Sequence, residues 1–509
     1  MAERRGKTPK IFIIVGLLLL WELLYYWRLI DPVRFSHPIA TIQVLGKSLG
    51  GFTMMLLQLT FASLLGSGIG FALGGLITRS TWLTQAVLRF LRLGLWLPFL
   101  IYWPLPIWPP RENYKYDPIF WAWIATAAAV ILSACYHHLT ARFTLGLEWR
   151  EARAQVVKAV ILQSLFICVI SQGWVSPYGW NWFLLPGQGE VAAVYTALVL
   201  LAVFVFLIGL VFQSDFEQTA AYRGMVVVRE VASTSWRSLM GAIVFTIVCL
   251  VLWHLITRPL YPYLLIGTPL DVLSIGYRLL TEGTSFPDMD STLWRHIGIS
   301  LIEVLGGLFL GGVAGLVTFR GLSTHNTLKT WLLPFLPLTY VVPIVLPLIV
   351  IHWVGRYTGP WRITLGVALL TFFPFIHVLW GLRARPTLCR ILLATDEALP
   401  FAFVAMIIGE AMNGVAGLGY FMVVARVTRN TVDAGLAASL LTVALFVILS
   451  ASLRSLVKQT YFQQGKNCGE QSLRDGRTRS GLPFCYLLLR ISGDSIVHLL
   501  SNESVSAPL

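Results

Sequence analysis

The chain has 509 residues, of which 56% are hydrophobic and only 12% are charged, and its mean hydropathy is +0.73. Soluble globular proteins carry about 25% charged residues, so this composition excludes an ordinary soluble domain and predicts a membrane protein. The formal net charge is +14. We attribute it to basic loops at a membrane rather than to nucleic-acid binding, because the sequence contains no basic, aromatic-rich soluble domain.

The apolar residues are gathered in runs of about 18 to 25, long enough for a helix to cross a hydrocarbon core of about 30 Å. We therefore predict an all-α polytopic membrane protein with about 12 transmembrane helices. In chain order the predicted spans are 11–29, 52–77, 91–108, 119–134, 159–175, 192–212, 239–256, 297–319, 328–354, 363–382, 399–425 and 434–453. Polar residues and glycines interrupt the fifth and the eleventh.

The basic residues predict the orientation, because short cytoplasmic loops collect lysine and arginine. Four basic residues precede the first predicted span: Arg4, Arg5, Lys7 and Lys10. The N-terminus is therefore expected in the cytoplasm, and an even number of crossings returns the C-terminus to the same side. The arginine-containing segments around 142–158 and 381–390 then also lie inside, whereas Arg426 and Arg429 are exceptions that this topology places outside.

Metal and redox chemistry find little support in the sequence. Six cysteines are scattered without a Cys-x-x-Cys spacing, so neither a disulfide framework nor a zinc site is indicated. His137 and His138 are adjacent, so they cannot both face one metal ion from a regular helix. We expect no metal and no cofactor bound by this chain.

An internal repeat divides the chain into two parts. Trp21 and Trp253 each precede an extended stretch and then a proline, Pro38 or Pro269, that opens an amphipathic segment. Farther on, LLGSGIGFALGGLIT from position 64 aligns without gaps to VLGGLFLGGVAGLVT from position 304, an offset of 240. We predict two parallel six-helix repeats, 1–235 and 236–465, followed by a cytoplasmic tail, 466–509. A unit with an even number of crossings keeps its orientation, so a pore between two like halves is expected.

At these motifs the second half resembles the membrane permease of a binding-protein-dependent ABC importer, of the nitrate, sulfonate and taurine type. The similarity lies in SLIEVLGGLFLGGVAGLVTFRG from position 300, in the proline-punctuated LLPFLPLTYVVPIVLPLIVIHWVG that follows, and in a glutamate, Glu410, before the Gly-Leu-Gly-Tyr turn at 417–420. The first half resembles the same pattern more faintly and lacks that turn. The resemblance implies two permease halves fused in one chain, in a bacterial inner membrane.

The resemblance also implies partners. Such permeases contact cytoplasmic ABC ATPase subunits through a short helix between the fourth and fifth spans, and an extracytoplasmic solute-binding protein delivers a small, anionic or zwitterionic solute. The matching positions for coupling to the ATPase are Arg150, Glu151 and Ala152 in the first half and Arg383, Arg385, Arg390 and Glu397 in the second. Only nine residues separate Pro400 from Glu410, so the second coupling element is shorter than in a typical member. Neither half contains a GxxxxGK[ST] loop, so ATP hydrolysis is assigned to a separate subunit and this chain is not expected to be an enzyme.

Polar residues and glycines inside the predicted spans are the candidates for a translocation path or gate. They are Glu303, Glu410, Asn413, Gly414, Gly417 and Gly419. A carboxylate inside a bilayer must face a partner or water. The alternative is a structural role, in which Glu410 and Asn413 satisfy backbone groups freed by the break at the glycines.

Two other functions remain open. A secondary transporter is also commonly built from two six-helix halves, but it requires a proton or sodium site in the membrane, which isolated carboxylates support poorly. A non-transporting, degenerate permease scaffold is favoured by the diverged first half and the compressed coupling region.

Overall fold

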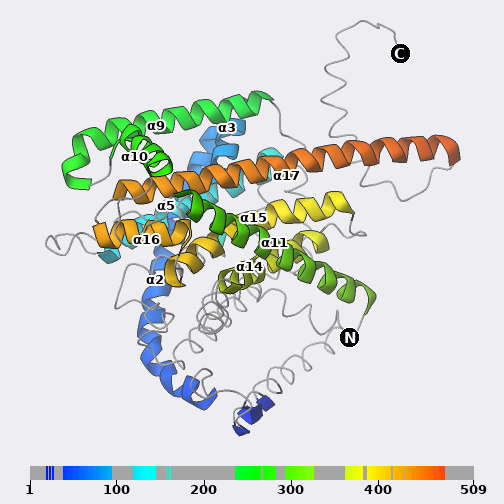
Figure 1. Ribbon diagram of the computed structural model, residues 1–509, viewed down its shortest axis with the longest axis horizontal. Helices are drawn as coiled ribbons and strands as arrows, with labels where there is room; N and C mark the ends of the chain where they lie inside the picture. Colours follow the sequence, from blue (N-terminus) through cyan, green and yellow to red (C-terminus); the bar gives the residue numbers. More distant parts are fainter. Residues whose placement is uncertain are drawn as a thin grey trace, which may run out of the picture.

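The computed structural model describes 38–94, 118–144, 236–264, 267–282, 293–325, 361–381, 387–413, 416–429 and 432–475, together with a few residues in 16–27 and 156–161. Within this part of the chain the structure is helical and contains no strand. In chain order the elements are α2 (Pro38–Ile77), α3 (Thr81–Gly94), α5 (Pro118–Leu139), a π-helical turn (Thr140–Thr144), α9 (Trp236–Leu264), α10 (Pro269–Thr281), α11 (Leu293–Thr324), α14 (Trp361–Gly381), α15 (Leu388–Asn413), α16 (Leu418–Arg429) and α17 (Val432–Asp475) (Figure 1).

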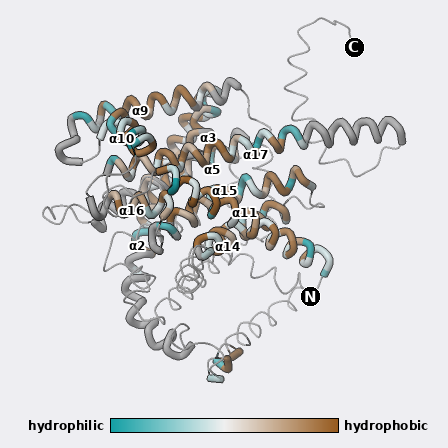
Figure 2. The backbone as a smooth tube through the Cα atoms, in the orientation of Figure 1, coloured by the Kyte–Doolittle hydropathy of each residue, from teal (hydrophilic) through white to brown (hydrophobic). Residues whose placement is uncertain are grey.

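Four of these helices contain a stretch that is long and apolar enough to cross a bilayer: Leu56–Ile77, Leu293–Thr324, Ile363–Trp380 and Asp433–Thr460. A shorter apolar stretch, Ile243–Leu255, lies in α9. Hydrophobic residues dominate the described helices in Figure 2. The predicted all-helical membrane character is confirmed for these segments. The predicted spans 91–108, 159–175, 192–212 and 328–354 lie outside the described residues, apart from a few at their edges.

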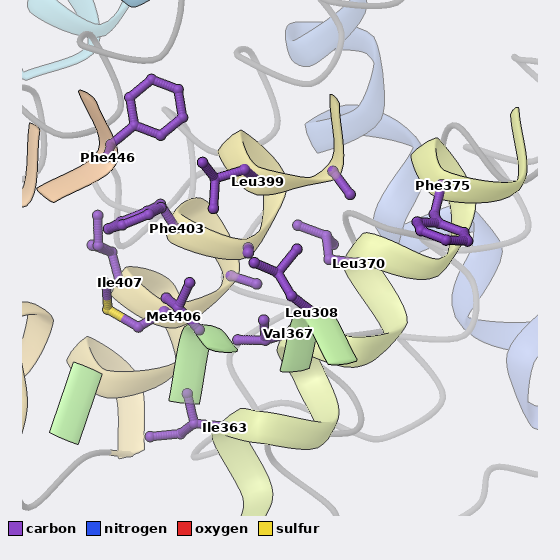
Figure 3. Packing of buried hydrophobic residues seen from close by; sticks show 14 of the residues in the cluster. Leu308, Ile363, Val367, Leu370, Phe375, Leu399, Phe403, Met406, Ile407 and Phe446 are labelled. Carbon is purple, nitrogen blue, oxygen red and sulfur yellow. The ribbon is translucent and has the colours of Figure 1, made fainter. Parts of the chain in front are cut away.

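The main hydrophobic core is formed by the second half of the chain. α15 contacts α11, α14, α16 and α17, and α14 also packs closely against α11 (Figure 1). Figure 3 shows how Leu308 of α11, Val367 of α14, Phe403 of α15 and Phe446 of α17 contribute to it. The rings of Phe403 and Phe446 meet edge to face, with their centroids 5.7 Å apart. Interlocked side chains therefore hold these four helices together.

α11 and α14 approach closely along a row of glycines. Gly307, Gly311 and Gly315 are spaced four residues apart, so they share one face of α11. A Cβ on Gly311 would lie 2.5 Å from the carbonyl oxygen of Ala368, and one on Gly315 would lie 2.7 Å from the ring of Phe375. The hydroxyl of Thr371 donates to the Gly307 carbonyl oxygen at 3.3 Å. Small residues that allow backbones to meet are a typical means of joining helices in lipid.

The first half contains a second seam with the same geometry, where α2 meets α5. Gly66, Gly70 and Gly74 face α5 at intervals of four residues. A Cβ on Gly66 would lie 2.7 Å from the Cβ of Val130, and one on Gly70 would lie 2.7 Å from the Cβ of Ala134. A Cβ on Gly74 would likewise lie 2.9 Å from the ring of His138. The α2–α5 pair is thus built as the α11–α14 pair is.

α9 and α17 lie at the positions where the sequence predicted divisions of the chain, 235 and 465. α9, the first predicted span of the second half, packs against α3 of the first half, where the rings of Phe90 and Phe245 lie 4.7 Å apart. α17 continues to Asp475, so the start of the predicted tail at 466 lies within a helix. The rest of that tail, 476–509, lies outside the described residues.

Candidate functional site

The candidate site lies where α15 and α16 meet. α15 ends at Asn413 and α16 begins at Leu418, so the predicted eleventh span, 399–425, is two helices rather than one. Gly417, the residue before α16, has a φ of 114°, a left-handed conformation that residues with a Cβ rarely adopt. A Cβ at this position would also collide with the carboxyl group of Glu410. The change of direction therefore requires glycine at 417.

The second glycine of the turn permits a close approach of two backbones. A Cβ on Gly419 would lie 2.5 Å from the carbonyl oxygen of Ile407 on α15. Without that Cβ, the backbone N–H of Gly419 reaches the buried Glu410 carboxyl group and donates to Oε2 at 2.7 Å. The glycines thus bring the start of α16 onto the side chain of Glu410.

Glu410 also connects α15 to α11. It is fully buried, and its Oε1 accepts a hydrogen bond from the hydroxyl of Ser300 at 2.5 Å. Ser300 lies on α11, 110 positions earlier in the chain. The single carboxyl group therefore ties together three helices.

Side chains of α11 satisfy the other free amides at the start of α16. The N–H of Gly417 donates to Nδ1 of His296 at 2.9 Å, and the N–H of Leu418 donates to the Oγ of Ser300 at 2.9 Å. The first turn of a helix leaves such N–H groups without partners inside the helix. Because Nδ1 of His296 accepts, a neutral ring carries its proton on Nε2. This arrangement supports the structural role that the sequence left open for Glu410.

Glu303 brings a second carboxyl group to the same place. His296, Ser300 and Glu303 follow each other at intervals of four and three residues, so they share one face of α11. Glu303 is buried, with an exposed fraction of 5%, and its carboxyl group interacts directly with that of Glu410. Its Oε2 has no hydrogen-bond partner among the residues that the structure describes. The sequence suggested isolated carboxylates, and the structure pairs two of them.

The remaining predicted site residues are only partly described. Asn413 is the last residue of α15. Gly414 and the coupling residues Arg150, Glu151, Ala152, Arg383 and Arg385 lie outside the described residues. Arg390 lies in the first turn of α15 and Glu397 lies nearer its middle, and both are partly buried. In the described part of the second half, Glu397 therefore belongs to a long helix that continues to Asn413 through Pro400.

One polar contact in this region was not predicted. Asp396, next to Glu397, is buried, and its Oδ1 accepts from the hydroxyl of Ser450 at 2.7 Å. Its Oδ2 forms an ion pair with Nε of Arg454 at 3.1 Å. The two partners lie four residues apart on α17, a spacing that could have indicated a shared face. This contact fixes the beginning of α15 to α17, far from Glu410 along the helix.

Metal binding has no support in the described part of the chain. No group of three or more His, Cys, Asp or Glu side chains there could hold a metal ion. Cys135, Cys249 and Cys389 are free thiols. The site is thus a network of carboxyl, hydroxyl and imidazole groups with backbone amides.

Comparison with known proteins gives one informative similarity. The chain is 28% identical over 235 residues to a probable ABC transporter permease protein of Haemophilus influenzae, an alignment that covers 40% of this chain and 90% of the relative. No known protein-family model matches the chain, and no solved structure matches it. The similarity supports a permease role in an ABC transporter.

Proposed function

We propose that this chain is the transmembrane permease subunit of an ABC importer, which forms the path for a small anionic or zwitterionic solute and is driven by a separate ATPase. The observation that carries the proposal is the similarity to a probable ABC transporter permease over nine-tenths of that protein's length. The apolar helices described above are consistent with a membrane location, which we propose to be the bacterial inner membrane with both termini cytoplasmic.

The two glycine seams support a construction from two like halves. Gly66, Gly70 and Gly74 lie 241 positions before Gly307, Gly311 and Gly315, and their contacts on α5 lie 237 positions before the corresponding contacts on α14. Both offsets stay constant over three successive contacts. The packing register differs by one residue from the offset of 240 that sequence alignment gives. We infer that 1–235 and 236–465 are diverged copies of one permease unit and that the solute passes between them.

α15 is suited to connect an ATPase to the interior of the membrane. Its 26 residues extend over about 39 Å. Arg390 lies at the end that the arginine pattern places in the cytoplasm, and Glu410 lies near the other end. Asp396 fixes the cytoplasmic part to α17 through Arg454. A movement imposed near Arg390 would therefore reach the α15–α16 break as a rigid-body displacement.

Reconstitution tests the proposal. The chain is purified from membranes with its bound partners and placed in liposomes. An importer permease is expected to copurify with an ABC ATPase, to stimulate its hydrolysis, and to respond to a solute-loaded binding protein. A chain that binds no ATPase and leaves hydrolysis unchanged contradicts the proposal and favours the scaffold interpretation.

The paired carboxyl groups favour one second candidate, a proton-driven secondary transporter. Such a transporter needs a protonatable site inside the membrane, and Glu303 with Glu410 provides buried carboxyl groups in contact. Uptake that requires a proton gradient and continues without ATP would identify this second function. Uptake that requires ATP and survives collapse of the gradient would exclude it.

A further inference from the structure

We propose that Glu303 and Glu410 form a proton-binding site that holds one proton between two carboxyl groups, and that this proton keeps α16 docked on α11. The inference goes beyond the proposed function, because it concerns how the helices are held together and is independent of what the chain transports. The two carboxyl groups lie 107 positions apart in the sequence and interact directly in the structure.

Burial makes two negative charges at this place unfavourable. Glu410 is fully buried and Glu303 is 5% exposed. The ion pair between Arg454 and Asp396 lies away from this site, nearer the other end of α15. Two carboxylates in contact repel each other, and in the described part of the chain no cationic side chain acts on this pair, so one of them takes up a proton. The ligand of the site is therefore a single proton.

The hydrogen bonds indicate how the remaining charge is distributed. Glu410 accepts from the hydroxyl of Ser300 and from the N–H of Gly419, and it faces the positive end of the α16 dipole. These donors stabilise a carboxylate. Among the described residues no comparable donor reaches Glu303, and its buried Oε2 has no hydrogen-bond partner there. The donors from Ser300 and Gly419 favour a carboxylate at Glu410, so in our proposal Glu303 carries the proton and shares it with Glu410.

The other titratable groups facing the site do not replace this proton. From α11, His296 accepts from the N–H of Gly417 through Nδ1, so a neutral ring fits its position. From α16, the ring of Tyr420 stacks on His296 with centroids 6.5 Å apart. From α14, the described neighbour at this level is Thr364, which lies against Gly306.

Release of the proton breaks the O–H bond of Glu303 and transfers the proton to water, which leaves two adjacent carboxylates. Their repulsion opposes the contact of α11 with α15 and so weakens the support of the α16 N-terminus. A folded state that retains a proton lost on unfolding becomes less stable as the pH rises. Glutamate in an unfolded chain titrates near pH 4.3. The unfolding equilibrium constant should therefore rise about tenfold per pH unit above that value while the folded site keeps its proton.

The test compares the full chain with Glu303→Gln, Glu410→Gln and a control, Glu282→Gln, in lipid nanodiscs between about pH 5 and pH 9. Glu282 is exposed at the end of α10. The amide introduced by Glu303→Gln imitates a protonated carboxyl group, so the melting temperature of this variant should exceed that of the wild type by a margin that grows with pH. Glu410→Gln should melt lower at every pH, because its amide cannot accept from both Ser300 and Gly419. Glu282→Gln should follow the wild type.

The proposal would be overturned if the difference in melting temperature between Glu303→Gln and the wild type stayed constant across this pH range. It would also be overturned if Glu303→Gln melted below the wild type. Infrared spectra provide an independent readout. At neutral pH, the spectrum of the wild type minus that of Glu303→Gln should contain the carbonyl band of a protonated carboxylic acid. The spectrum of the wild type minus that of Glu282→Gln should lack this band. Its absence from the first difference would also refute the site. Neither measurement depends on transport, so failure here and failure of the permease function are distinguishable.

Discussion

The glycine seam between α11 and α14 should tolerate no added methyl group at its centre. A Cβ on Gly311 would lie 2.5 Å from the carbonyl oxygen of Ala368 and 3.2 Å from the backbone nitrogen of Phe372. Both are backbone atoms, so no side-chain rotation relieves the contact. Forcing atoms into a packed interior costs about 1 to 3 kcal/mol. Gly311→Ala should lower the free energy of unfolding by this amount, although alanine is the better helix former.

A matched control lies on the same helix. Gly298 has no atom within 4 Å of an added Cβ, so Gly298→Ala should be neutral or stabilise the protein by up to about 1 kcal/mol through helix propensity. The first half offers a matching variant and control. A Cβ added at Gly70 would lie 2.5 Å from the carbonyl oxygen of Ile131, whereas a Cβ added at Gly68 would have no atom within 4 Å. Reversible unfolding in mixed micelles measures all four variants. Equal stability of Gly311→Ala and Gly298→Ala would refute the packing argument.

Three further predictions concern polar contacts. Ser300→Ala leaves the Leu418 N–H without its acceptor and should lower the free energy of unfolding by about 1 to 3 kcal/mol. Ser300→Thr keeps the hydroxyl and should recover most of this stability. Equal losses of stability in the two variants would contradict a role for the hydroxyl. Asp396→Asn removes the charge that pairs with Arg454 and should cost about 1 to 3 kcal/mol. A double-mutant cycle with Arg454→Met should give a favourable coupling energy, and a coupling of zero would show that this ion pair does not hold α15 to α17. Hydrogen bonds from Thr268 lower the pKa of Asp271 at the start of α10. The ionised Asp271 therefore stabilises the start of this helix above about pH 4, and the stabilisation disappears as the pH falls through the lowered pKa. Hydrogen exchange of the first turn of α10 should show this loss, and Asp271→Asn should abolish the pH dependence; the same dependence in the variant would refute it.

The sequence predicted those features that depend on local chemistry. Pro269 begins α10, as expected from a proline that opens an amphipathic segment, and the structure adds a capping box of Thr268 and Asp271. The bounds of α14 lie within two residues of the predicted span 363–382. Apolar periodicity and helix-start signals are properties of neighbouring residues, so they can be recognised without knowledge of the fold.

Features that depend on tertiary contacts were missed or misplaced. The eleventh span was predicted to begin at 399, next to Pro400, yet α15 runs from Leu388 through that proline. Apolar helices tolerate such prolines where neighbouring helices satisfy the freed backbone groups. Glu303 and Glu410 were both selected as candidates, but their contact depends on the packing of α11 against α15. The spacing of His296, Ser300 and Glu303 marks one helix face, and it was the available signal for a shared site.

The most direct test of the account measures ATP hydrolysis by the copurified ATPase in liposomes with and without this chain. The account predicts stimulation that depends on the chain and increases further when a solute-loaded binding protein is supplied outside. An ATPase whose rate is the same with and without the chain, in liposomes that retain the folded protein, would contradict the assignment as a permease.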